Sequence, residues 1–183
     1  MPFRWMMDVL LWPVCRVVWA WACRRERTIC CEGTPLTAYQ RELARVAGVV
    51  HGDAVRVSLA EEIPVPLPLV LRRIATRVGL ISPYLAGMTL GHGIVLRSDC
   101  RDDTRLLLHE LTHVAQVERL GGIASFMRAY VRECVWPGYP HGPLEREARA
   151  AESRVVSSDA ADAHATPHAD VLPYGASKNL GFS

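Results

Sequence analysis

The stretch Thr104–Leu120 reads TRLLLHELTHVAQVERL and carries the pattern His109-Glu110-x-x-His113 within an apolar helical repeat. Histidines four residues apart on a helix lie on one face, so their imidazoles can bind one zinc ion together. The glutamate between them is placed to accept a proton from a zinc-bound water. We therefore expect a zinc-binding helix in which Glu110 is the general base.

A catalytic zinc site needs a third protein ligand and one position left open for water. The helix itself supplies none, because Gln116 and Arg119 stand where metzincins have glycine and histidine. The helix that begins at Pro143 offers Glu145, which we favour, and Glu147 as the alternative. Two residues correspond to about 200° around a helix, so only one of the two can face the metal.

Several other polar residues are weaker candidates. Tyr139 and His141 lie in a Pro/Gly loop and either stabilise an oxyanion during catalysis or anchor that loop. His141, His164 and His168 are less favoured zinc ligands, since the last two lie in a polar tail. His92 either faces a substrate cleft or is an ordinary exposed histidine.

The pattern around the motif predicts an α+β fold, in which the motif helix packs against a small sheet with further helices. Gly121-Gly122 ends the motif helix, and residues 28–36, with Gly33 and Pro35, indicate a linker. The other expected elements are a helix over 38–46 with Thr37 as N-cap, a strand over 54–59, a loop over 61–68, a helix over 69–78, one strand over 87–98, and helices from 123 to 135 and from 143 onward.

Three regions follow from this pattern: an N-terminal arm (1–33), the domain that holds the motif (34–156) and a disordered tail (157–183). Residues 9–27 predict an amphipathic helix, since Val9–Cys23 is shorter than the roughly 20 residues of a spanning helix. Tryptophan beside arginine suits a helix packed on the domain and equally one lying on a membrane surface. The second alternative would make the protein membrane-associated.

Composition limits the partners and the compartment. The chain has 183 residues and a net charge of +2, which is too small to indicate nucleic-acid binding. Its six cysteines include no C-x-x-C pair, so we expect free thiols in a reducing compartment, the cytoplasm.

The motif and its flanks resemble the zincin-type metallopeptidase domains of bacteria, of the gluzincin kind, and are similar to the core domain associated with contractile injection systems. A T-L-G strand matches Thr89–Gly91, an HELTHxxQ helix matches His109–Gln116 and an E-x-E-A pattern matches Glu145–Ala148. The similarity extends more loosely over residues 36–152. Where gluzincins often have E-x-x-A-D around the third ligand, this chain has Arg149 in place of the aspartate.

The resemblance implies a zincin-like fold, Zn²⁺ as cofactor, Glu145 as third ligand and hydrolysis of a polypeptide substrate. It also implies that the strand Gly87–Leu96 binds extended substrate through its edge. Two other functions remain open: a non-catalytic zinc-binding module, such as an adaptor or cargo element, and a membrane-surface protein whose motif is a relic.

Overall fold

The computed structural model describes residues 2–66, 85–133, 138 and 140–153, with side chains from residue 16 onward. The helix expected over 69–78, the tail over 157–183 and Tyr139 lie outside the described residues.

A four-stranded mixed sheet lies at the centre of the fold, in the order β1-β2-β4-β3. Its strands are β1 (Thr34–Pro35), β2 (Arg56–Ala60), β3 (Gly87–Leu90) and β4 (Gly93–Arg97). β2 and β4 are parallel, whereas β1 pairs antiparallel with β2 and β3 antiparallel with β4. The expectation of an α+β fold with a small sheet is therefore confirmed.

The single strand expected over residues 87–98 is wrong, because the chain reverses in its middle. Gly91 has a φ of 65°, a left-handed conformation that glycine adopts readily, and β3 turns there into β4. Consequently, of these two strands, β3 lies at one edge of the sheet and β4 is paired on both sides.

The helices begin where capping residues stand. α2 (Ala38–Ala47) starts after Thr37, whose side chain and that of Gln40 form a capping box. α4 (Thr104–Arg119) starts after Asp103, whose carboxylate accepts the first free backbone N–H groups. α5 (Ile123–Glu133) follows, residues 143–153 form a further helix, and short 3₁₀ helices η1 (Gly52–Ala54) and η2 (Ser98–Cys100) flank β2 and β4.

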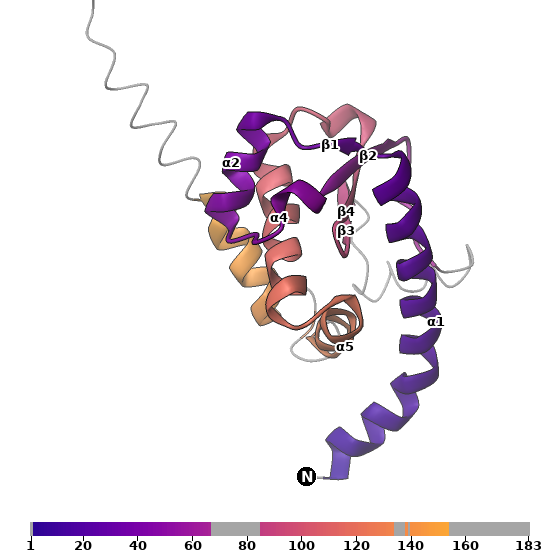
Figure 1. The fold of residues 1–183 in the computed structure, drawn as a ribbon. Coiled ribbons are helices and arrows are strands. Elements are labelled where there is room, and N and C mark those ends of the chain that lie inside the picture. The colour runs from indigo at the N-terminus through magenta and orange to yellow at the C-terminus, as the bar shows by residue number, and fades with distance from the viewer. Residues whose placement is uncertain (1, 67–84, 134–137, 139, 154–183) are drawn as a thin grey trace, which may run out of the picture.

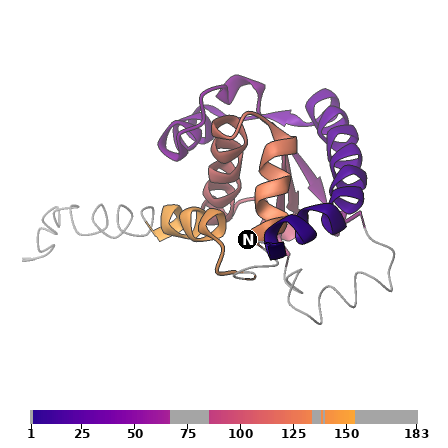
Figure 2. The same cartoon turned by 90° about the horizontal axis from the view of Figure 1, so that it is seen from below.

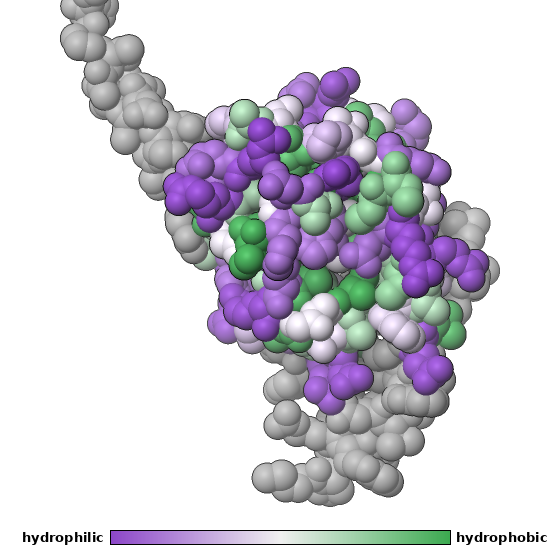
Figure 3. Space-filling model, in the orientation of Figure 1, coloured by the Kyte–Doolittle hydropathy of each residue, from purple (hydrophilic) through white to green (hydrophobic). Residues whose placement is uncertain are grey.

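Helices cover both faces of the sheet (Figures 1 and 2). Alternate residues of β4 point to opposite faces, so Ile94 and Leu96 pack with α2 and α4 in one apolar cluster. Val95 packs on the other face against Ala22 and Ile29 of α1 (Pro2–Glu32). On the face seen in Figure 3, polar residues predominate and apolar patches are small and separate.

The N-terminal arm is a long helix whose C-terminal half belongs to the core. Residues 28–32 complete α1 and Thr34–Pro35 pairs with β2, so the expected linker is wrong. Gly33 lies where α1 passes directly into the sheet. A Cβ there would lie 2.5 Å from the Ile29 carbonyl oxygen, so the glycine serves this close approach and not a linker. No helix among the described residues is both long and apolar enough to cross a membrane.

Candidate metal centre

Two neighbouring turns of α4 and the helix of residues 143–153 bring together three potential metal ligands. The Nε2 atoms of His109 and His113 lie 3.1 Å apart. Each lies 3.6 Å from a carboxylate oxygen of Glu145, which is buried with His113. The structure thus places the favoured third residue beside the histidine pair.

This donor set fits zinc. With zinc–ligand bonds of about 2.0–2.1 Å in a tetrahedral arrangement, ligand atoms lie about 3.3 Å from one another. The observed separations of 3.1, 3.6 and 3.6 Å are close to that value. Two imidazole nitrogens and one carboxylate oxygen would also leave the fourth position open, as in catalytic zinc sites.

Both imidazoles are held through the nitrogen that faces away from the site. His109 Nδ1 donates to Glu152 Oε1 at 2.6 Å, and His113 Nδ1 donates to Gln116 Oε1 at 2.8 Å. Each ring therefore presents the Nε2 lone pair to a metal. The sequence prediction missed both partners, although Glu152 stands seven residues after Glu145 and so on the same helix face.

Gln116 also fixes the two helices against each other. It is completely buried, and its amide nitrogen donates to Leu144 O and to Glu147 Oε2, each at 3.0 Å. Glu147 in turn accepts two hydrogen bonds of 2.7 Å from Arg119. The alternative ligand is therefore engaged with α4 residues outside the histidine pair.

Glu110 is buried on the side of α4 that faces β3. Its Oε2 atom lies 2.7 Å from the hydroxyl of Thr89, which is also 2.9 Å from the Glu110 carbonyl oxygen. A Cβ at Gly87 would lie 2.5 Å from Glu110 Oε1, so glycine leaves the space that this carboxylate occupies. The T-L-G strand thus holds the general-base candidate in place.

A tyrosine of α5 completes the surroundings of the site. Tyr130 packs edge-on against His113 with ring centroids 5.9 Å apart, and its hydroxyl lies 3.4 Å from Glu145 Oε2. The sequence prediction missed it; the signal was its i, i+4 spacing from Phe126, which packs against the same imidazole. His141, one of the two loop candidates for stabilising an oxyanion, is exposed and lies just before the helix of residues 143–153.

The neighbouring histidines favour the charged form of the Glu145 carboxylate. Burial raises the pKa of Glu145, but the neighbouring His113 and His109 lower it more, and the net shift is downward. Burial lowers the pKa of His113, whereas Glu145 and Glu110 raise it to give a net upward shift. The buried carboxylate of Glu145 is thus available to neutralise a cation.

In comparisons with known proteins, no family model, no curated protein and no solved structure matches this chain. The function therefore has to be inferred from the geometry of the site.

Proposed function

We propose that the chain is a zinc-dependent peptidase with a zincin-like fold of the gluzincin kind. The observation that carries this proposal is the convergence of His109, His113 and Glu145 around one point, beside a buried Glu110 that is not part of the ligand set. A purely structural metal does not require such a glutamate.

Zinc, when bound by these three residues, would acidify a water molecule and polarise the carbonyl of the scissile peptide bond. Glu110 accepts a proton from the attacking water and delivers it to the leaving amine. Thr89 positions that carboxylate, since its hydroxyl is 2.7 Å from Oε2. The hydroxyl of Tyr130 lies 3.4 Å from Glu145 Oε2, and we assign it the stabilisation of the oxyanion.

We place the polypeptide substrate along β3. β3 is an edge strand next to α4, so its outer backbone groups can pair with an extended polypeptide in the manner of an added strand. Within the segment Gly87–Leu96, Gly87–Leu90 can act in this way, because β4 is already paired with both β2 and β3.

Zinc content and cleavage of a broad peptide library, measured together for wild type and Glu110→Gln, test this function. We expect equal zinc at the His109 site and cleavage only by the wild type, because the substitution removes the base and keeps the ligands. Zinc bound in both without cleavage of any peptide would instead favour the non-catalytic zinc-binding module.

A further inference from the structure

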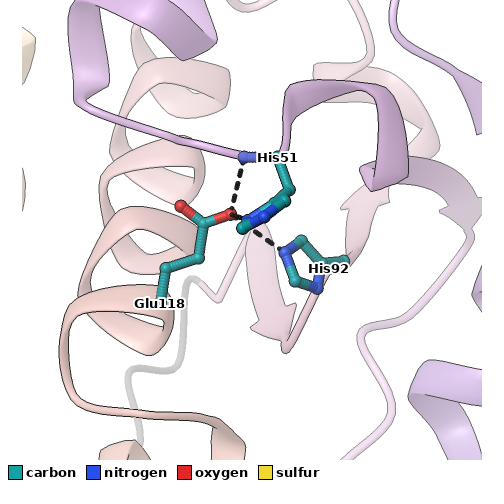
Figure 4. A group of neighbouring side chains, drawn as sticks. All are labelled: His51, His92 and Glu118. Carbon is teal, nitrogen blue, oxygen red and sulfur yellow. Dashed lines mark hydrogen bonds and ion pairs between the residues drawn. The ribbon is translucent and has the colours of Figure 1, made fainter.

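A second group of side chains with metal-binding chemistry lies elsewhere on α4 (Figure 4). It consists of Glu118 from the last turn of α4, His51 from the loop after α2 and His92 from the turn between β3 and β4. Glu118 follows His113 by five residues, which is about 140° around the helix. The group therefore belongs to a different face of α4 from the site described above.

Two imidazole nitrogens converge on a single carboxylate oxygen in this group. His92 Nε2 lies 3.0 Å and His51 Nδ1 lies 3.2 Å from Glu118 Oε1. The two rings meet edge to face with centroids 6.1 Å apart. The two nitrogen–oxygen distances are near the roughly 3.3 Å expected between ligand atoms of one tetrahedral zinc ion.

Hydrogen bonding alone accounts poorly for this arrangement. Glu118 Oε1 already accepts the backbone N–H of His51 at 2.9 Å, and Oε2 accepts that of Val50 at 2.6 Å. A carboxylate oxygen offers about two lone-pair sites, so Oε1 cannot serve the backbone group and both imidazoles equally well. A cation between the rings would replace both imidazole contacts and leave the backbone hydrogen bonds intact.

The three segments are held in place before any metal binds. The backbone hydrogen bonds from Val50 and His51 fix their loop to Glu118. The backbone N–H of His92 donates to Glu26 Oε1 of α1 at 3.0 Å, which fixes the turn. The Glu118 side chain is only 9% exposed, whereas that of His51 is 68% exposed, so an ion can enter from solvent.

We propose that His51 Nδ1, His92 Nε2 and Glu118 Oε1 form a second zinc site, independent of the proposed catalytic one. Two imidazoles favour zinc over magnesium and calcium, which prefer oxygen ligands. Bound there, zinc links the loop after α2, the β3–β4 turn and the end of α4, and it keeps a solvent-facing position for water or a partner's side chain.

Zinc titration of the metal-free full chain tests the site, with His51→Asn and His92→Asn as the variants. Asp53→Asn is the matched control, because it introduces the same residue at an exposed position of η1, two residues after His51. We expect two zinc equivalents for wild type and control, and at least about tenfold weaker binding of one equivalent in each histidine variant, since even partners of metal ligands contribute 10–100-fold.

Circular dichroism shows whether the variants fold, and the exposed ring of His51 makes its substitution the safer one. Histidine ring nitrogen NMR during the wild-type titration gives a second readout, in which His51 Nδ1 and His92 Nε2 shift with zinc. Unchanged zinc binding in both variants, or unchanged signals of these nitrogens, would overturn the site. One equivalent in wild type and none in His92→Asn would support it and refute the proposed peptidase.

Discussion

Glu145 and Glu147 are two positions apart in the sequence and have entirely different partners. Glu145 is buried beside the two imidazoles, whereas the side chain of Glu147 is 39% exposed and paired with Arg119. Substituting each by glutamine makes the same chemical change at the proposed metal ligand and at a residue that contacts Gln116 and Arg119 instead.

Glu145→Gln is expected to weaken zinc binding at the His109–His113 pair by at least about tenfold, because it replaces a charged ligand by a neutral amide. Glu147→Gln keeps a side-chain oxygen that can accept from Gln116 and loses the charge of the Arg119 pair, so it should change that affinity less than about twofold and cost at most about 1 kcal/mol of stability. Competition with a chromogenic chelator, in a His92→Asn background so that one site is counted, measures both. Equal losses in the two variants would contradict the assignment of Glu145.

Tyr130→Phe is expected to lower kcat by about 100-fold with little change in KM, because removing one oxyanion donor costs about 10²–10³ in rate. The phenylalanine ring preserves the packing on His113, so zinc content should stay unchanged. Steady-state kinetics on a peptide cleaved by the wild type measure the effect. Tyr39→Phe, at an exposed tyrosine of α2, is the matched control, and a loss confined to KM would refute the role of Tyr130.

The elements that the sequence predicted best are those with local signals. α2 begins after Thr37 and α4 after Asp103, because their side chains satisfy backbone groups within their own first turns. The β3–β4 hairpin was missed, since Gly91 and Gly93 are equally compatible with a bulged single strand. What selects the hairpin is pairing of β3 back along β4, a contact that no local pattern reports.

The packing of α1 on the sheet can be tested by substituting one buried and one exposed residue of this helix. Ile29 is 4% exposed and packs on the sheet beside Gly93, whereas Val17 of the same helix is 66% exposed. Ile29→Ala should lower the free energy of unfolding by about 2–5 kcal/mol, as for other buried isoleucines. Val17→Ala should change it by no more than about 0.5 kcal/mol. Urea unfolding measures both, and similar losses would contradict the packing of α1 on the sheet.

The described residues form four apolar clusters, of which the two largest lie on opposite faces of the sheet, and none includes a proposed metal ligand. Chelation is therefore expected to abolish cleavage and lower the Tm while leaving one cooperative thermal transition. A ligand at 100 times its Kd contributes about 2.7 kcal/mol, which is a fraction of the stability of such a domain. Calorimetry with and without EDTA, and re-addition of zinc, checks this.

Loss of the cooperative transition on chelation would indicate a structural metal and favour the zinc-binding module. Full cleavage activity after metal removal would refute metal-assisted hydrolysis altogether.

The motif helix and its end were determined by the sequence alone, because spacing on one helix fixes which side chains share a face. The choice between Glu145 and Glu147 was reasoned from helix geometry, but their partners depend on how the helix of residues 143–153 docks on α4. The roles of Glu152 and Tyr130, and the meeting of His51, His92 and Glu118, were decided only by the tertiary structure. These residues are far apart along the chain, and burial of apolar surface, which is not directional, brings them together.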